Sequence, residues 1–564
     1  MIKFILALLI LTGVIFQNPA MIKTGGTYDS GVGYWGPLAR DGVWHEALVG
    51  QILRSFPPDN PGLAGLKLTN YHYFYDLVVA GATLITGIAP SFFIYRFFPV
   101  VFSVLLGLLT YLLAWRLFKS KLVSLLAVFF AYFGSSFGWI VEYIKRGSIW
   151  AGESAFWANQ PVSMNLNPPF AISLVLLIGI ILMFLRYQKT RSKVLFFVLS
   201  LLSGTLIGFK VYAGILVLFA LAALSIEAIL VKKNFDLLKL FGLSLIISAF
   251  VFLPQASLGR GLIEFKPLWL IDSMIDAGDR VGIPNFTARR FAYLNSDKWL
   301  HLFLLETLSF LMFVAGNLGT RVLGVFWAFK IWKKELFKLG DFCFIFWMSL
   351  AAFLLPILFI QKGNTWNTIQ FFYYFLYFSS LFTAYALGQI YEKLPKAASV
   401  IIIGVVLVIT PISSIATFRS WLYPNPPAKL TKGELAGLEF LKEQEDGVVL
   451  KHPFDPDLRG KFEDPYPLAV YADNAYVSAY SGKPVFIEDV EQQIVLGSDY
   501  KPRLENAERF FIEKNLSWSN DFLKENNIKY VYLPEIYFLP IAEQEYIMRK
   551  IFENEEVNIY RVLQ

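Results

Sequence analysis

The chain has 564 residues, of which 56% are hydrophobic, 17% are aromatic and only 16% are charged, and its formal net charge is +7. Soluble domains are charged at about a quarter of their positions, so this composition excludes an ordinary soluble protein and favours helices that pack in lipid. The single cysteine, Cys343, excludes an intramolecular disulfide and a thiolate metal cluster.

Charge is divided unevenly along the chain. Residues 428–564 hold 16 Lys and Arg against 25 Asp and Glu, a net charge of −9, so the preceding residues carry +16. Cytoplasmic loops of membrane proteins are enriched in Lys and Arg, which accounts for a basic membrane part. No basic stripe accompanies a nucleic-acid-binding motif, and we therefore expect no nucleic-acid partner.

Apolar runs fill most of the chain before the acidic tail. The first begins directly after Lys3 and resembles a signal peptide, but it lacks a clear small-residue cleavage site, so we interpret it as an uncleaved membrane helix. A span needs about 20 apolar residues. The eleven runs that can span are residues 3–17, 97–118, 122–144, 170–186, 194–209, 212–230, 237–256, 304–329, 341–360, 369–391 and 398–418.

The connections between these runs predict the topology of a multi-pass plasma-membrane protein. Every second connection is short and basic, as at 186–193, and is expected in the cytoplasm together with the N-terminus. The other connections carry Trp, Pro, Asn and acidic residues and are expected outside, as is the C-terminus after eleven crossings. These outer connections are residues 18–96, 145–169, 257–303 and 361–368.

Two apolar segments do not fit a simple span. The run 73–89 is amphipathic, carries Asp76 near its start and is bounded by Pro90, so we place it along the membrane interface. The run 299–332 contains a Gly316-Asn317-Leu318-Gly319 break that is compatible with two short helices. The charge rule favours one net crossing for it.

The character of the sequence changes at the linker marked by Pro424, Pro426 and Pro427. We therefore predict an all-α polytopic membrane domain over residues 1–427, including the first outer loop 18–96, and an extracytoplasmic α/β domain over residues 428–564. Its predicted helices are Lys432–Glu443, Ala507–Asn515, Asp521–Asn526 and Glu543–Phe552. Its predicted strands are Gly447–Lys451, Tyr476–Tyr480, Pro484–Ile487, Lys529–Leu533 and Val557–Val562. The tail contains no phosphate-binding glycine loop and no nucleophile elbow.

The first outer loop holds the segment Asp41-Gly42-Val43-Trp44-His45-Glu46. Asp41 and His45 are four residues apart and share a face if this segment is helical. A carboxylate beside an imidazole can deprotonate a hydroxyl group or hold a metal. Equally, Asp41 can be an N-cap that opens an interfacial helix. His72 is either a further metal ligand, with Asp41 or Glu46, or a hydrogen-bonded aromatic residue.

The features that follow this loop give it context. They are the aromatic segment Asn70–Asp76, the amphipathic run, the helix start Tyr95-Arg96-Phe97-Phe98-Pro99 and, in the tail, Ser481-Gly482-Lys483-Pro484-Val485. This order over the whole chain resembles the GT-C superfamily of membrane glycosyltransferases, near the branch of the protein mannosyltransferases and aminoarabinose transferases. Arg96-Phe97-Phe98-Pro99 matches that branch's Arg-x-x-Pro helix start, whereas the prolines usual in the aromatic segment are absent here.

The resemblance implies a sugar transfer from a polyprenyl-phosphate donor to a glycan, lipid or protein acceptor on the outer face of the membrane. By motif position, Asp41 takes the role of general base in an inverting reaction, and Glu153, preferred over Glu142, is the second acidic residue. His45, Glu46 and His72 are expected to contact the acceptor or the sugar. Members of the superfamily differ in metal dependence, so a divalent metal stays open.

A lipid phosphate also needs cations in a pocket that opens to the bilayer. The outer loop 257–303 and an outer helix end supply them, and the expected phosphate ligands are Lys210, Arg260, Arg280 and Arg289. For Lys210 the alternative is a lysine that extends to the interface. The rival function is a transporter or flippase of lipid-linked saccharides, although no internal symmetry of two related halves is visible. A third hypothesis is that the protein is a structural scaffold in the membrane.

Overall fold

The computed structural model describes residues 1–150, 155–256, 263–335, 339–542 and 546–563. Internal contacts divide the chain into two compact units. We call the first the helical unit, which comprises Met1–Pro19, Val100–Pro254 and Gly261–Leu422. The mixed unit comprises Ala20–Pro99, Gln255–Arg260 and Tyr423–Gln564. Each unit is described by itself.

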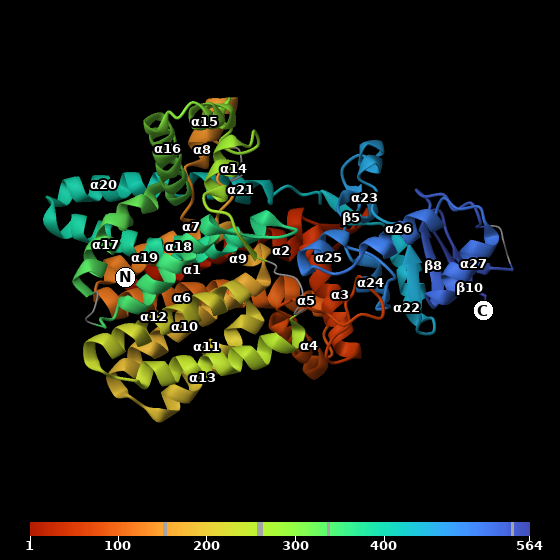
Figure 1. Ribbon diagram of the computed structural model, residues 1–564, viewed down its shortest axis with the longest axis horizontal. Helices are drawn as coiled ribbons and strands as arrows, with labels where there is room; N and C mark the ends of the chain where they lie inside the picture. The colour runs from red at the N-terminus through yellow and green to blue at the C-terminus, as the bar shows by residue number, and fades with distance from the viewer. Residues whose placement is uncertain (151–154, 257–262, 336–338, 543–545, 564) are drawn as a thin grey trace. The chain divides into compact units, whose positions relative to one another are not determined.

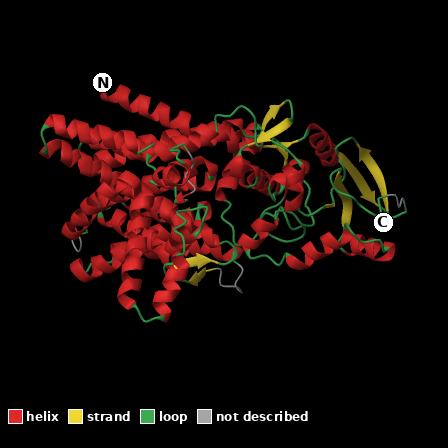
Figure 2. Cartoon of the chain, turned by 90° about the horizontal axis from the view of Figure 1, so that it is seen from above, coloured by secondary structure: helices red, strands yellow, loops and turns green. Residues whose placement is uncertain are grey.

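Each of the eleven predicted apolar runs is helical in the structure (Figures 1 and 2). The helices that cover them are α1 (Ile2–Gln17), α6 (Phe98–Phe118), α7 (Lys121–Phe133), α8 (Gly138–Arg146), α10 (Pro168–Thr190), α11 (Lys193–Phe209), α12 (Val211–Lys232), α13 (Asp236–Phe252), α16 (Trp299–Leu318), α17 (Val322–Glu335), α18 (Cys343–Leu358), α19 (Gln370–Lys393), α20 (Lys396–Ile409) and α21 (Ile412–Ser420).

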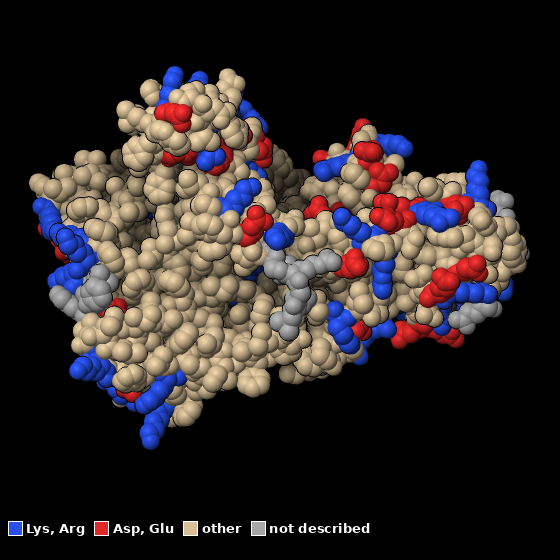
Figure 3. Space-filling model, in the orientation of Figure 1, with Lys and Arg blue, Asp and Glu red and all other residues tan. Residues whose placement is uncertain are grey.

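Length and apolar composition support a multi-pass membrane protein. Within the described ranges, six helices are long and apolar enough to cross a membrane, or seven if the bent pair α7–α8 is one span. Helices α1, α11 and α18 are apolar but have only 16 or 17 residues. The count of eleven spans therefore stays a prediction. Figure 3 shows the flanks of α11–α13 free of charge, with Lys and Arg gathered at their lower-left ends.

Three helices of the helical unit are broken, and their breaks meet. The predicted span 122–144 bends by 44° between α7 and α8, the run 299–332 breaks at Gly319–Arg321, and α20 gives way to α21 at Pro411. Thr320 and Thr410 join their hydroxyls at 2.5 Å. Broken helices leave carbonyl groups that need donors, and the buried Arg321 guanidinium donates to the Asn317 and Leu318 carbonyls.

A four-stranded sheet joins the first outer loop to the tail within the mixed unit. Its order is β1 (Gly26–Tyr28), β2 (Gly31–Tyr34), β5 (Ala428–Leu430) and β7 (Tyr466–Pro467). Strand β2 pairs antiparallel with β5 in the register Val32↔Leu430, and β5 pairs parallel with β7. Residues 20–99 thus pack with the tail, whereas the sequence placed the whole first outer loop with the spanning helices.

The tail carries a second four-stranded sheet in the order β6 (Val448–Lys451), β8 (Ile528–Pro534), β10 (Val557–Val562) and β9 (Met548–Glu553). Strands β6 and β8 are parallel and the other pairs are antiparallel. The helices α22 (Lys432–Glu443), α26 (Lys501–Phe510) and α27 (Leu516–Glu525) accompany it. Buried side chains such as Leu450, Val531 and Phe522 form the core.

Two predictions for the tail give the wrong type of element, and the predicted strand Pro484–Ile487 has only an isolated bridge of Val485 to Val449. The predicted strand Tyr476–Tyr480 is the helix α24 (Tyr476–Ser481), which Asn474 opens by accepting the Tyr476 backbone N–H and Gly482 closes at φ +68°. The predicted helix Glu543–Phe552 contains strand β9 instead, because β10 offers it a hydrogen-bonding edge. Long-range pairing overrides local propensity in the second case.

Gly31 provides a test of the pairing between loop and tail. Its φ is +124°, and a Cβ there would clash with the Leu430 carbonyl oxygen. We expect Gly31→Ala to break the β2–β5 pairing and to lower the free energy of unfolding by on the order of 2 kcal/mol. The measurement is the thermal unfolding of the purified protein. Gly50→Ala in α3 (Asp41–Arg54), where an added Cβ meets nothing within 4 Å, is the control; equal melting of both variants would show that the pairing is dispensable.

Candidate active site in the mixed unit

Asp41 opens helix α3, which follows the short 3-10 helix Gly36–Ala39. The N-cap position belongs to Arg40, and no side chain caps the helix, so Asp41 does not act as the N-cap. A carboxylate in the first turn still suits the partial positive charge of a helix N-terminus. The Asp41 side chain is 44% exposed and its Oδ1 lies 3.4 Å from the Arg40 Nε. Asp41 is therefore the solvent-accessible acid of this segment.

Arg40 connects Asp41 to a group of acids from the tail. Its guanidinium forms an ion pair with Glu491. Burial lowers the pKa of Arg40, but the charges of Asp41, Asp489 and Asp473 outweigh burial and raise it. Asp489 is fully buried and caps the helix Val490–Leu496 by accepting the Gln492 backbone N–H. Arg40 is thus a permanent cation held between the α3 start and the tail.

His45 finds its carboxylate partner on another helix. It lies one turn after Asp41 on α3, as the spacing predicts, but its Nδ1 is 2.8 Å from the Asp76 Oδ1. Asp76 belongs to α4 (Phe74–Thr86), the helix predicted at the interface, and both side chains are buried. The Tyr75 ring meets the imidazole edge-on at 5.5 Å. Asp76 therefore fixes the orientation of His45, because a carboxylate hydrogen-bonded to one ring nitrogen holds an imidazole in place.

Glu46 lies among tyrosines on the other side of α3. Its carboxyl accepts a hydrogen bond from the Tyr34 hydroxyl at 3.5 Å, and Tyr95 lies nearby. The Tyr34 hydroxyl in turn forms a short hydrogen bond with the hydroxyl of Tyr480 from the tail. Burial raises the pKa of Glu46 to about 7, although both tyrosines and the charge of Arg96 lower it. Glu46 is half protonated near neutral pH.

The other predicted site residues considered with Asp41 are His72, Glu142, Glu153 and Arg260. The His72 ring stacks on Tyr71 at 4.8 Å. Glu153 and Arg260 lie outside the described residues. Glu142, the alternative to Glu153, is buried in α8, with its Oε2 3.5 Å from the Arg146 Nε. The structure therefore supplies no geometry for a second catalytic acid.

Lys210 occupies the junction of α11 and α12 in the helical unit, as the interruption of the apolar stretch predicts. It is buried, donates from its Nζ to the Asn167 Oδ1 at 3.2 Å and lies 5.6 Å from the Tyr212 ring. A chain of amides continues from Asn167. It consists of Gln370, Asn367 and Gln361, which are hydrogen-bonded in that order and end at the Tyr212 hydroxyl. This arrangement offers one cation and several neutral hydrogen-bonding groups.

The loop arginines have three different environments. The Arg280 guanidinium is buried and stacks on Trp157 at 3.6 Å and on Trp366 at 4.9 Å. Arg290 forms ion pairs with Asp272 and Glu306, which neutralise it. Arg289 is exposed. Lys210 is therefore the buried cation that lies at a helix junction beside uncharged polar groups.

Several residues around Asp41 escaped the sequence analysis. Asp76 was noted only as part of an amphipathic run, and Arg40 only as a neighbour of Asp41. Tyr480 stood in a predicted strand, and Glu491 carried no signal at all. Their partners lie 31 to 451 residues away in the chain. The contacts between Arg40 and Asp41, which are adjacent, and between Tyr34 and Glu46, which are 12 residues apart, are local.

Comparison with known proteins supports the fold. No protein-family model matches the sequence, and no curated protein matches it significantly. Among solved structures, the oligosaccharyltransferase of Archaeoglobus fulgidus in complex with Zn and sulfate is 16% identical, with a TM-score of 0.51 over 94% of this chain and 68% of that one. The same enzyme tethered to an acceptor peptide is 14% identical, with a TM-score of 0.52 over 100% and 74%.

ArnT from Cupriavidus metallidurans, in the apo state, is 10% identical, with a TM-score of 0.48 over 99% of this chain and 97% of that one. At such identities the likeness concerns the fold. The chain therefore has the fold of the archaeal oligosaccharyltransferase. This confirms the resemblance at the level of fold, whereas the mannosyltransferase and aminoarabinose transferase branch stays a prediction.

A metal site of the usual kind does not fit the residues present. In the part of the chain that the structure describes, no three His, Cys, Asp or Glu residues converge closely enough to hold a metal ion. The Asp76 partner of His45 is a single carboxylate, and the His72 ring is stacked on Tyr71. We therefore derive no chemical step through a metal.

The raised pKa of Glu46 predicts a specific pH dependence of stability. In the folded protein this carboxyl holds its proton up to about pH 7, whereas in the unfolded chain it loses the proton near its ordinary value of 4.5. Stability is therefore lost as pH rises from about 4.5 to 7, by on the order of 2–3 kcal/mol for this group alone. Glu46→Gln removes that contribution.

The measurement compares the thermal unfolding of wild type and Glu46→Gln between pH 5 and 8. We expect the variant to gain stability relative to wild type as the pH rises. Glu443→Gln, an exposed glutamate of α22, is the control and should follow wild type. A constant difference between wild type and Glu46→Gln across this range would mean that Glu46 titrates normally.

Proposed function

We propose that this protein transfers a sugar from a polyprenyl-phosphate-linked donor to an acceptor on the outer face of the membrane, with inversion at the anomeric carbon. The observation that carries the proposal is the position of Asp41 in a chain of GT-C fold. It is an exposed carboxylate at the first residue of α3, with the Arg40 guanidinium beside it. This is the arrangement that a general base needs, since it must reach a proton on a bound acceptor.

The other acids of this segment are less suited to that role. Asp76 is buried completely and is engaged with His45. Glu46 is enclosed by Tyr34 and Tyr95 and is half protonated near neutral pH. A base must be accessible to the acceptor and ionised at the working pH. We therefore assign Asp41 as the base, with His45 and Glu46 as residues that position α3 around it.

In the proposed reaction, Asp41 accepts the proton of the acceptor's nucleophilic group. The acceptor atom forms its bond to the anomeric carbon of the donor sugar, on the face opposite to the phosphate. The bond from that carbon to the phosphate oxygen breaks, and the polyprenyl phosphate leaves with the electron pair. One displacement inverts the configuration and needs no covalent enzyme intermediate.

Lys210 is the residue we propose to bind the donor phosphate. An ammonium group is a compact charge that suits a phosphate, and the neighbouring amides Asn167 and Gln370 can hydrogen-bond to sugar or phosphate oxygens. The Archaeoglobus oligosaccharyltransferase has been solved in complex with an inhibitory peptide and a dolichol-phosphate, so a protein of this fold binds a lipid phosphate. We propose Arg280 and Arg289 as further ligands of the donor phosphate. Because two tryptophan rings stack on the Arg280 guanidinium, only its in-plane N–H groups can bind the phosphate.

The orientation follows from charge. The basic connections after α6, α10 and α12 would face the cytoplasm, and the mixed unit would lie outside. Donor lipid, bilayer and an extracytoplasmic glycan, lipid or protein acceptor are the partners that this orientation implies.

Asp41→Asn tests the proposed base. The amide keeps the size of the side chain but cannot accept the proton, so we expect transfer from a panel of polyprenyl-phosphate sugars to fall at least a hundredfold in the purified protein. Asp29→Asn, an exposed acid in the same loop, should keep wild-type turnover. Equal turnover by Asp41→Asn and wild type would remove Asp41 from the mechanism. Lipid translocation without any transfer by wild type would instead establish a flippase.

Lys210→Gln tests the phosphate site separately. Loss of a charge-assisted hydrogen bond should raise the KM for the lipid donor about tenfold or more, with a smaller effect on the KM for the acceptor. Lys210→Arg should restore part of the loss, because it keeps the charge. Lys298→Gln, an exposed lysine of the same unit, is the matched control. An unchanged donor KM in Lys210→Gln would show that this lysine has only a packing role.

A further inference from the structure

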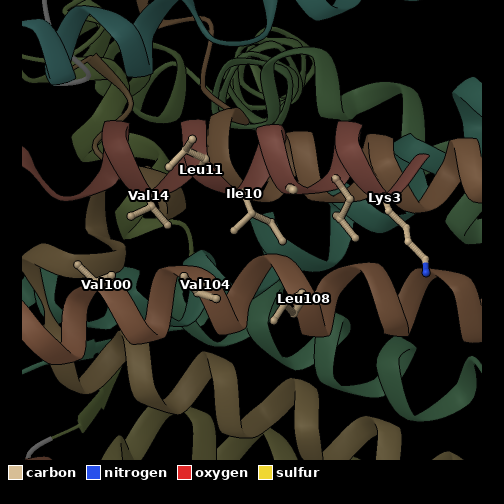
Figure 4. Close-up of a pocket in the computed structure, with 9 residues that line it drawn as sticks. Lys3, Ile10, Leu11, Val14, Val100, Val104 and Leu108 are labelled. Carbon is tan, nitrogen blue, oxygen red and sulfur yellow. The ribbon is translucent and has the colours of Figure 1, made fainter. Parts of the chain in front are cut away.

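A groove runs along the helical unit between α1 and α6. It has a volume of about 520 Å³ and is lined by Lys3, Leu6, Ala7, Ile10, Leu11, Val14, Val100, Val104 and Leu108. Figure 4 shows Val14 across from Val100, Ile10 near Val104, and Lys3 beyond Leu108, so that the two helices run antiparallel along it. Among the described residues that line the groove, Lys3 alone carries a charge.

The floor of the groove is built by close packing around Tyr132 of α7. A Cβ at Gly13 or at Gly107 would collide with the Tyr132 side chain. The Tyr132 hydroxyl donates to the Ser103 carbonyl at 2.6 Å, which fixes the ring beneath the groove. Two glycines and a buried tyrosine therefore allow α1 and α6 to pack closely against α7 beside the groove.

The end of the groove beyond Val14 is closed by polar side chains. The Asn18 Nδ2 donates to the Ser103 Oγ at 3.2 Å, and the Asn165 Nδ2 donates to the Asn18 Oδ1 at 2.8 Å. The Ser103 hydroxyl donates to Gln17. All four side chains are buried. An apolar chain that entered this network would break its hydrogen bonds, so an occupant has to stop at Val14.

The length of the groove defines the occupant. From Lys3 to Val14 the helix rises 1.5 Å per residue over eleven steps, or about 16 Å. The hydrocarbon core of a bilayer is about 30 Å thick, so one leaflet has a depth of about 15 Å. We infer that this groove is a binding site for one acyl chain of an anionic phospholipid, whose phosphate pairs with Lys3.

The direction of α1 and α6 indicates the membrane leaflet from which the bound lipid would come. Because α1 and α6 are antiparallel, the Lys3 end of the groove faces the end of α6 that leads to Lys119 and Lys121. That connection is basic and belongs to the cytoplasmic side in the proposed orientation. Anionic phospholipids of this leaflet favour a nearby Lys. The lipid donor proposed above is used on the opposite side of the membrane, so this site is distinct from the donor site and does not depend on the proposed activity.

Photocrosslinking tests the site in the full-length protein. The protein is placed in nanodiscs of phosphatidylcholine that contain a small fraction of either phosphatidylglycerol or phosphatidylcholine with a diazirine in the acyl chain. Mass spectrometry then locates the adducts. We expect them in wild type on the lining residues of α1 and α6, with phosphatidylglycerol favoured over phosphatidylcholine.

Two pairs of variants separate the groove from the general lipid surface. Val104→Trp and Leu108→Trp fill the groove and should each lower the adducts on α1 and α6 at least tenfold. Leu112→Trp, which is 50% exposed on α6 but does not line the groove, should leave them unchanged. Because two different positions are filled, misfolding of one variant, detected by gel filtration, leaves the test intact.

Lys3→Gln separates the headgroup contact from the groove. Removing one lysine should lower the preference for phosphatidylglycerol about fivefold while keeping the adducts in place. Lys193→Gln, an exposed lysine at the start of α11, should not change the preference. Equal adducts in Val104→Trp, Leu108→Trp and Leu112→Trp would overturn the site, as would a lipid preference that Lys3→Gln leaves at the wild-type value.

Discussion

The pairing of β2 with β5 is the constraint on which the candidate site depends. Three residues of the first loop form a ladder with three residues of the tail, more than 390 positions away in the chain. Gly31 permits the close approach, because its backbone adopts a positive φ that other residues avoid. Strand β2 ends at Tyr34, and α3 starts seven residues later. The position of Asp41 is therefore set by a sheet that neither segment could form alone.

Helix α3 combines side chains that are fixed by contacts with one that is accessible to solvent. Two sides of the helix are fixed, one by the contact of His45 with Asp76 and the other by the contact of Glu46 with Tyr34. Each pair gives a polar side chain a hydrogen-bonding partner away from water, where a polar group without a partner would cost free energy. Asp41 at the helix start is left 44% exposed, with Arg40 beside it. A rigid helix with one accessible carboxylate is the kind of scaffold that holds a base in place for an incoming substrate.

The sequence predicted what depends on local patterns and missed what depends on distant partners. Apolar runs located the long helices of the helical unit but not its short helices Gln160–Leu166, Trp269–Asp276 and Phe286–Asn295. The tail elements Lys432–Glu443 and Val557–Val562 were predicted with the bounds that the structure has. The helix α24 was read as a strand because its aromatic residues favour strands, although Asn474 and Gly482 carry capping signals. The carboxylate partner of His45 could not be predicted, since only the packing of α3 on α4 selects Asp76 over the sequence neighbour Asp41.

Arg40, Arg321 and Arg280 are held by different kinds of partner. In the mixed unit, Arg40 is held by carboxylates, so its charge is balanced. In the helical unit, the Arg321 guanidinium donates to carbonyl groups of a helix end. The Arg280 guanidinium stacks on two indole rings and pairs with Asp279, whose side chain is 70% exposed. That choice suits a unit surrounded by lipid, where burying an ion pair means desolvating two charges. Lys210 likewise has an amide oxygen and an aromatic ring as its neighbours.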